Sequence, residues 1–312
     1  MRKLFSLMLV VLGAAALVSC SKDDNDDVLR DGEGVITFVT KAKSLPLQGG
    51  IIKYLSVETF NEGESITIDW GDGNEEEYVS VKEVEGDEVW YEIIPEHTYT
   101  DGKSSHTITI RGKIKWFSVD DCEVTSIDVT KCPALEELEC YGNQLTSLDV
   151  SKNTALEYLN CGHNQLTSLD ISKNTALKEL DCFNNKLASL DVSKNTALRY
   201  LYCYDNQLTS LDVSKNTALK GLECYDNQLT SLYVSGCTAL KRLQCYNNQL
   251  TSLNVSGCTA LEDLYCSGNQ FSASAMNKIY NDLPVVNNGY LRCNKLGDYS
   301  IAENKGWYIY VY

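Results

Sequence analysis

The sequence predicts a mainly β protein, in which a solenoid of 21-residue coils with a parallel sheet follows a small antiparallel β-sandwich. Two observations predict this fold. A pattern of leucine, cysteine and asparagine recurs every 21 residues between residues 135 and 269. Before it, short runs of alternating apolar and polar residues are separated by turns rich in Gly and Asp, as expected for half-buried antiparallel strands.

The repeat keeps its spacing through seven copies in phase, whose first leucines run from Leu135 to Leu261. Its unit reads L-x-x-L-x-C-x-x-N-x-L-T-S-L-D-V-S-K-N-T-A, with small variations. In x-L-x-C-x, the Leu and Cys side chains point to the same side of a strand. One coil cannot bury that side, but stacked coils bury it against one another. We expect the Asn to turn the chain and to satisfy buried backbone groups, and the convex side to be extended or short 3₁₀ structure.

This unit resembles the leucine-rich repeat, with cysteine in place of the usual third leucine. A divergent copy upstream keeps the same phase, so the predicted solenoid covers residues 114–271. Residues 272–312 are predicted to cap its open core. The predicted elements of this cap are a helix over 272–283, with Ser272 or Ser274 as its N-cap, and two strands, Tyr290–Cys293 and Trp307–Tyr312.

Residues 34–113 form the predicted sandwich. Its expected strands are Val35–Val39, Ile51–Val57, Ser65–Ile68, Val89–Ile93 and Thr107–Ile110.

Two short motifs in this region, Asp69-Trp70-Gly71-Asp72-Gly73 and His97-Thr98-Tyr99, resemble the signature of PKD-like domains. The resemblance implies that Trp70 and Tyr99 are core residues and that Asp-Gly closes a hairpin. The acidic turn does not match the D-x-D-x-D-G spacing of calcium loops, which favours a solvated hairpin over a calcium site.

The chain begins with features of an exported lipoprotein. Arg2 and Lys3 precede an apolar run that is shorter than the roughly 20 residues needed to span a bilayer. Residues 1–19 are therefore predicted to be a signal peptide. Leu17-Val18-Ser19-Cys20 resembles a bacterial lipobox, which implies cleavage before Cys20 and lipidation of that residue. The alternative is an ordinary signal peptide with a chance cysteine.

Residues 20–33, the lipidated cysteine and an acidic stretch, have the composition of a solvated tether. Lys22-Asp23-Asp24 so soon after Cys20 resembles the surface-export signal of Bacteroidota lipoproteins. That resemblance implies a protein anchored by lipid in the outer membrane and facing the exterior.

The charge balance excludes some partners. If residues 1–19 are removed, 25 of the 27 basic residues remain against 43 acidic ones, a net charge of −18. Nucleic acid and anionic lipid surfaces are bound through Lys and Arg, so neither is expected as a partner. The membrane is expected to be contacted only through the N-terminal lipid.

The sequence shows no catalytic constellation. Its three histidines, His97, His106 and His163, share no motif or common site, and no nucleophile elbow, phosphate loop or H-E-x-x-H is present. We therefore predict that the protein is not an enzyme and needs no metal or cofactor.

The thirteen cysteines belong mostly to the repeat. Stacked one per coil about 4.7–4.9 Å apart with parallel Cβ vectors, the repeat cysteines are too far apart for disulfides, which predicts buried free thiols. Cys132, Cys237 and Cys258 share a second column on the convex side. A disulfide between Cys237 and Cys258 remains the alternative there.

The positions that the repeat leaves free carry the functional signal. Residues beside the inner Leu and Cys point to the concave face of the solenoid, and many of them are aromatic. The candidate ligand-binding residues are Tyr141, Phe183, Tyr200, Tyr202, Tyr204, Tyr225, Tyr246 and Tyr265. An exposed aromatic column indicates a partner, whereas the alternative is a ladder that stabilises the sheet by stacking.

Over nearly its full length the chain resembles Bacteroidota surface lipoproteins with internalin-like repeats, which implies extracellular recognition. We therefore predict a monomeric adhesion or binding lipoprotein that recognises an extracellular protein through the concave face. Two alternatives remain: capture of a glycan, whose sugar rings also stack on aromatic side chains, and a structural spacer without a specific ligand.

Overall fold

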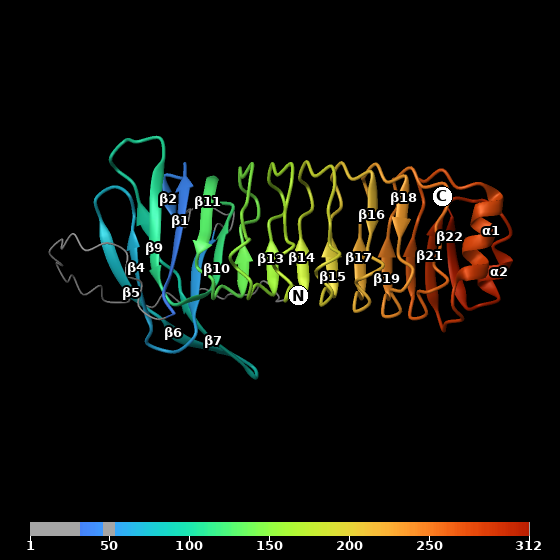
Figure 1. The fold of residues 1–312 in the computed structure, drawn as a ribbon, viewed down its shortest axis with the longest axis horizontal. Helices are drawn as coiled ribbons and strands as arrows, with labels where there is room; N and C mark the ends of the chain where they lie inside the picture. Colours follow the sequence, from blue (N-terminus) through green and yellow to red (C-terminus); the bar gives the residue numbers. More distant parts are fainter. Residues whose placement is uncertain (1–31, 46–53, 312) are drawn as a thin grey trace.

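The structure, a computed structural model, describes residues 32–45 and 54–311. The predicted signal peptide and Cys20 lie outside the described residues, as does most of the predicted tether. The described chain is an elongated stack of strands with two helices at its C-terminal end (Figure 1). Within the described ranges, no helix is both long and apolar enough to cross a bilayer.

The N-terminal part contains two layers of mostly antiparallel strands. The first layer has the strand order β11-β1-β9-β4-β5, and its strands are β1 (Gly34–Thr40), β4 (Ser65–Asp69), β5 (Glu75–Val79), β9 (His106–Gly112) and β11 (Val124–Lys131). The second layer contains β3 (Tyr54–Thr59), β6 (Val81–Glu85), β7 (Glu88–Ile93) and β10 (Ile114–Asp120). Two short strands, β2 (Ser44–Leu45) and β8 (His97–Thr98), form a separate pair.

The two layers share one apolar core. The ring centroids of Phe38 on β1 and Phe117 on β10 lie 5.8 Å apart, and both side chains are buried. Trp70 is fully buried and Tyr99 is buried beside it, its hydroxyl donating to the Trp70 carbonyl over 3.0 Å. The expectation of antiparallel sheets in this region is confirmed.

Strand β10 joins this part to the solenoid. It pairs antiparallel with β3, where Phe117 lies opposite Val57, and parallel with β12, where Phe117 lies opposite Leu138. One sheet of 13 strands therefore runs from β6 to β22. The predicted boundary at residues 113 and 114 falls inside a continuous sheet and core, so the N-terminal layers cover the first coil of the solenoid directly.

The solenoid itself is a parallel stack of short strands, visible side by side along the long axis in Figure 1. From β12 to β20, each strand residue pairs with the residue 21 positions later in the next strand, as Leu138 does with Leu159. The strands are β12 (Glu137–Glu139), β13 (Tyr158–Asn160), β14 (Glu179–Asp181), β15 (Tyr200–Tyr202), β17 (Gly221–Glu223), β19 (Arg242–Gln244) and β20 (Asp263–Tyr265). The predicted parallel sheet of 21-residue coils is confirmed.

The return side of the coils is made of turns and extended chain, with one short parallel pair, β16 (Ser210–Asp212) and β18 (Ser231–Tyr233). The described residues contain no 3₁₀ helix, so of the two conformations expected there the extended one is formed. Its leucines and valines, such as Leu208 and Val213, are fully buried against the strand leucines. The apolar core of each coil therefore lies between its strand leucines and the leucines and valines of its return side.

Two buried asparagine columns tie successive coils together. The side chain of Asn206 donates to the carbonyl of Cys182 over 3.0 Å and accepts the Leu187 N–H over 3.0 Å. On the return side, Asn195 donates to the carbonyls of Ile171 and Asn174 over 3.0 and 2.9 Å. Because these backbone groups are buried, the asparagines supply partners that the short strands do not provide.

The cysteines of the described residues are all free and buried. Burial raises the pKa of the repeat thiols, for example those of Cys203 and Cys245. The alternative disulfide between Cys237 and Cys258 is not formed; their sulfur atoms instead lie 3.2 and 3.5 Å from the carbonyl oxygens of Val213 and Val234.

The C-terminal cap contains α1 (Ala273–Asp282), β21 (Gly289–Cys293), α2 (Ser300–Glu303) and β22 (Trp307–Val311). Ser272 is the N-cap of α1 and accepts the Ala275 N–H over 3.1 Å. The helix buries Met276, Ile279 and Tyr280 against the last coils. Both expected strands extend the long sheet in parallel.

Candidate functional site

The outer face of the long sheet, from β10 to β22, is the surface predicted above as the concave face; we call it the sheet face. Three columns of side chains point outward on it, one residue of each column per coil. The first and second columns flank the inner leucine of each strand, and the third follows the inner cysteine. From β10 to β17 the first column is Trp116, Glu137, Tyr158, Glu179, Tyr200 and Gly221, the second is Ser118, Glu139, Asn160, Asp181, Tyr202 and Glu223, and the third is Asp120, Tyr141, Gly162, Phe183, Tyr204 and Tyr225.

The third column contains a continuous aromatic stack. Neighbouring ring centroids lie 4.6 Å apart for Phe183 and Tyr204, and 4.4 Å apart for Tyr204 and Tyr225 and for Tyr225 and Tyr246. The interplanar angles are 8–10°, so the rings cover one another and are half-buried. The stacked aromatic ladder, which the sequence analysis gave as the alternative to an exposed binding column, is therefore present.

In the third column, Gly162 lies between Tyr141 and Phe183 and has no side chain to separate their rings. The ring centroids of Tyr141 and Phe183, two coils apart, approach to 5.8 Å across it. A Cβ atom at Gly162 would lie 2.9 Å from the Phe183 ring, so a side chain there would push the two rings apart.

The remaining candidate aromatics lie outside the stack. Tyr200 and Tyr202 flank Leu201 on β15, with parallel rings 6.5 Å apart. The Tyr265 ring on β20 lies under the guanidinium of Arg292, whose Cζ atom is 4.7 Å from its centroid. All three are half-buried. The eight predicted residues therefore share one face but fall into a stacked and an unstacked group.

Carboxylates lie between these aromatic side chains. Burial, and then the charge of Glu179, raise the pKa of Asp181 to about 7. Burial also raises the pKa values of Glu179 and Glu223. Near the N-terminal end of the face, burial and the charge of Glu139 raise the pKa of Asp120.

Hydrogen bonds hold some of these groups in place. The Trp116 indole donates to Glu139 over 3.0 Å, and the Tyr158 hydroxyl donates to Asp181 Oδ2 over 3.4 Å. The other carboxylate oxygen of Asp181, Oδ1, is buried and has no hydrogen-bond partner among the described residues. Trp116 and Asp120 were missed from the sequence because their coil departs from the repeat consensus; the phase of the repeat would have placed both on this face.

Basic side chains reach the face near its C-terminal end. Arg242 Nε lies 3.3 Å from Asp263 Oδ2, and Gln244 donates to Glu223 over 3.0 Å. Arg292, on the cap strand β21, covers Tyr265 as described above. The face is therefore charge-balanced at this end and acidic in its middle.

The histidines differ from the sequence expectation in one respect. His97 and His106, expected to share no site, both pack on Tyr99, with ring centroids 4.7 and 3.5 Å away. His97 bonds Asp72 over 2.7 Å and His106 bonds Asp101 over 3.0 Å. Distant segments meet because β8 and β9 bring both histidines to the end of the core. The histidines are packed and paired within the N-terminal layers, away from the sheet face.

The acidic turn is a hairpin between β4 and β5. Asp69 accepts the Gly71 N–H over 2.9 Å, and Asp72 accepts the Asn74 N–H over 3.0 Å. These bonds stabilise the turn itself. In the part of the chain that the structure describes, no three His, Cys, Asp or Glu side chains converge as metal ligands.

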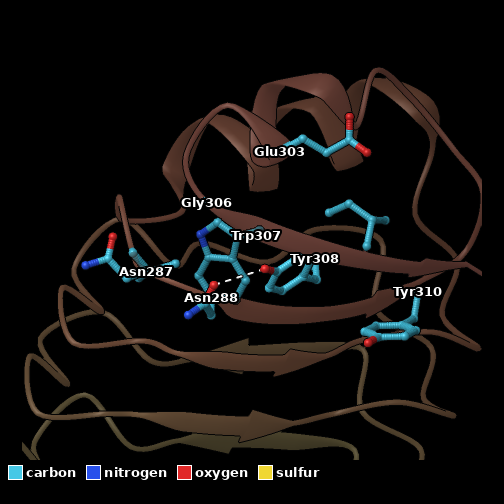
Figure 2. Close-up of a pocket in the computed structure, with 9 residues that line it drawn as sticks. Asn287, Asn288, Glu303, Gly306, Trp307, Tyr308 and Tyr310 are labelled. Atoms are coloured by element: carbon cyan, nitrogen blue, oxygen red, sulfur yellow. Dashed lines mark hydrogen bonds between the residues drawn. The ribbon is translucent and has the colours of Figure 1, made fainter.

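A shallow hollow of about 810 Å³ lies beside β22, in the cap (Figure 2). Figure 2 shows the Tyr308 hydroxyl bonded to Asn288 Oδ1, over 3.0 Å, and Glu303 above it on the helical side. The Trp307 indole donates to the Pro284 carbonyl over 2.8 Å. The hollow brings together a single carboxylate and no nucleophile with an adjacent base, so its lining does not resemble a catalytic centre.

Comparisons with known proteins agree with this fold. Residues 154–195 match the family model described as leucine-rich repeats in two copies. No curated protein matches the chain.

Several solved structures are similar to it. The functional domain of InlJ from Listeria monocytogenes, which includes a cysteine ladder, shares 27% identity, with 68% of this chain and 56% of that chain covered and a TM-score of 0.42. The internalin InlF from the same species shares 23% identity, with 63% and 73% covered and a TM-score of 0.40. A chain in an octameric complex of Latrophilin 3, Unc5D and the leucine-rich-repeat part of FLRT2 shares 19% identity, with 64% and 69% covered and a TM-score of 0.52.

The match thus spans little more than half of the InlJ chain. The last comparison has the highest TM-score of the three and shows the fold alone. Together with the matched repeats and the 21-residue register, it leads to one conclusion: the chain carries a mainly β leucine-rich-repeat solenoid.

Proposed function

We propose that this protein is a binding protein of the cell surface that recognises an extracellular protein through the sheet face. The leucine-rich-repeat solenoid is a fold typical of protein–protein interaction. The observation that supports the proposal is where the repeats differ from one another. The return side repeats Thr-Ser-Leu-Asp-Val-Ser-Lys-Asn-Thr-Ala with few changes, whereas successive strands read Tyr-Leu-Tyr, Gly-Leu-Glu and Arg-Leu-Gln.

The size of the sheet face approaches that of a small protein interface. Ten strands about 4.8 Å apart span roughly 43 Å, and the three columns span about 13 Å along the strands. The resulting area, roughly 600 Å², is somewhat below the about 800 Å² per partner of a standard protein interface.

The aromatic stack favours a protein over a glycan. Sugar rings bind aromatic side chains by lying on the ring face, but the faces of Tyr204 and Tyr225 are covered by their neighbours in the stack. Tyr200 and Tyr202 lie outside the stack and beside carboxylates, an arrangement of the kind found in protein interfaces.

The placement at the cell surface rests on sequence features. The lipobox resemblance at Cys20 and the acidic stretch after it support a lipid anchor in the outer membrane, facing outward. The N-terminal layers, which resemble a PKD-like domain in their motifs, would then stand between the tether and the sheet face.

Binding to paired arrays of extracellular matrix proteins and glycans tests the proposal. The variant is Tyr200→Ser with Tyr202→Ser, and the matched control is Tyr233→Ser, a tyrosine that is 55% exposed on the return side. We expect binding to the protein array that is lost in the double variant and kept in the control. Hits on the glycan array alone would favour glycan capture. If the folded protein binds nothing on either array, the favoured function becomes that of a structural spacer without a specific ligand.

A further inference from the structure

We propose that the partner contacts the middle of the sheet face with an extended segment that carries an arginine at every third position. This inference rests on the proposed function and adds the chemistry of the partner to it. It follows from the charge of the face, from the spacing of its carboxylates and from the way the chain's own arginines use the same surface.

The middle of the sheet face is acidic and contains no positive charge of its own. None of the residues in the three columns from β10 to β17 is lysine or arginine. Basic residues such as Lys178 precede the first column, at its margin, and Lys178 pairs there with Glu157. A cationic partner is the complement of such a surface.

The carboxylates of the second column are regularly spaced. Glu139, Asp181 and Glu223 lie on β12, β14 and β17, each two coils from the next, with Asn160 and Tyr202 on the coils between them. At about 4.8 Å per coil, neighbouring carboxylates are about 9.6 Å apart.

That spacing matches an extended ligand running along the stack. In a polyproline II segment the chain rises about 3.1 Å per residue and completes a turn in three residues. Side chains at every third position therefore point the same way and recur about every 9.3 Å, close to the spacing of the carboxylates. The two periods stay in register over three contacts.

The chain's own arginines show the same contacts at the C-terminal end of the face. Arg292 lies over the Tyr265 ring and Arg242 pairs with Asp263. A planar guanidinium can make both contacts, stacking on an aromatic ring and bonding a carboxylate, whereas the lysine ammonium lacks the planar fork. In the middle of the face, Tyr202 lies between Asp181 and Glu223 in the second column. An arginine of the bound protein could there stack on the Tyr202 ring and bond a neighbouring carboxylate.

Fluorescence anisotropy at pH 8, where Asp181 is mostly ionised, tests the register with synthetic peptides and the full chain. The first probe is (Arg-Pro-Pro)₃, and two comparison peptides have the same length: one with its three arginines in a block followed by six prolines, and one with lysine in place of arginine. We expect the spaced arginine peptide to bind about tenfold more tightly than either comparison peptide, because only it places planar cations on all three carboxylates. Equal affinity for the three peptides would show attraction by net charge alone and overturn the proposal.

Variants of the chain locate the contact. Asp181→Asn and Glu223→Gln should each weaken binding of the spaced peptide about fivefold, whereas Asp170→Asn and Asp191→Asn, which remove the same charge from the return side, should leave it unchanged. Circular dichroism and the urea midpoint check that every variant is folded. Equal weakening by all four variants would contradict the assigned surface.

The outcome is separable from the proposed function. An array partner that is lost with the Tyr200 and Tyr202 variants but bound normally by Asp181→Asn would keep the binding function and overturn the arginine register. No array partner together with tight, register-dependent binding of (Arg-Pro-Pro)₃ would keep the register and leave the identity of the natural partner open to arrays of basic proteins.

Discussion

The two buried asparagine columns should differ sharply in their contribution to stability. In Asn206→Ala, the Leu187 N–H loses its acceptor, and no second bond of that N–H appears among the described contacts. The carbonyl of Cys182, in contrast, still accepts a bond from Asn185 over 3.2 Å. One buried donor left unpaired costs about 1–3 kcal/mol, and the lost side-chain bonds add about 1 kcal/mol. We expect the free energy of unfolding to fall by about 3 kcal/mol.

The return-side column provides the matched comparison, Asn195→Cys. Its two acceptors keep other partners, because the Ile171 and Asn174 carbonyls also accept backbone N–H groups over 3.0 and 3.1 Å. The substitution also removes a buried oxygen, Asn195 Oδ1, that has no partner among the described residues. Three coils already have cysteine in this column, at Cys132, Cys237 and Cys258. We expect the free energy of unfolding to fall by about 1 kcal/mol or less.

Urea unfolding of both variants under reducing conditions measures the difference, and hydrogen exchange of the Leu187 amide localises it. Since long repeat arrays can unfold in stages, the slopes of the transitions are compared before the free energies. Equal destabilisation by the two variants with unchanged slopes, or a Leu187 amide that stays protected in Asn206→Ala, would refute this account of the asparagine columns.

Three further predictions concern the sheet face and the core. The pKa of Asp181 is raised to about 7 in the folded chain from an ordinary value near 3.8, so its charge opposes folding above about pH 7 and not below about pH 4; Asp181→Asn should raise the urea midpoint at pH 8 and leave it unchanged at pH 4, and a gain at both pH values would rule out ionisation as the cause. Tyr204→Ser removes two stacking contacts and should cost about 2 kcal/mol more than Tyr233→Ser in urea unfolding; equal costs would mean that the ladder does not stabilise the sheet. The buried repeat thiols, such as Cys203, should react with a maleimide only after unfolding, and rapid labelling of the folded chain in mass spectrometry would contradict their burial.

The regular part of the fold was predictable because its physical cause is repeated in the sequence. One coil fixes the inner leucine and cysteine, and the fixed period of 21 then fixes the register of every other coil, as between Leu138 and Leu159. The cap helix followed from its Ser272 N-cap and its apolar spacing. The four-residue helix α2 was not predicted, because one turn carries too little periodicity.

The irregular parts of the fold were harder to predict from the sequence, for identifiable reasons. Strand β5 begins with three glutamates, Glu75–Glu77, and all five residues of β6 (Val81–Glu85) are exposed. Neither strand therefore shows the alternation of apolar and polar residues expected of a half-buried strand. The N-terminal layers and the solenoid share one sheet because β10 pairs with β3. This contact is long-range, so no local sequence pattern predicts it.

At the candidate site, the sequence placed the aromatic residues on one face but not their contacts with one another. Whether Tyr204 offers its ring to a partner or to Tyr225 depends on side-chain rotamers, which the repeat does not encode. The packing of His97 and His106 on Tyr99 likewise depends on tertiary structure.

The most direct test of the central claim is a footprint of the sheet face in the presence of the strongest partner from the protein array. Hydroxyl-radical labelling read by mass spectrometry reports the accessibility of individual tyrosines. Binding through the sheet face predicts that Tyr200 and Tyr202 become protected while Tyr233 on the return side stays labelled. Protection of Tyr233, with Tyr200 and Tyr202 unchanged, would contradict it.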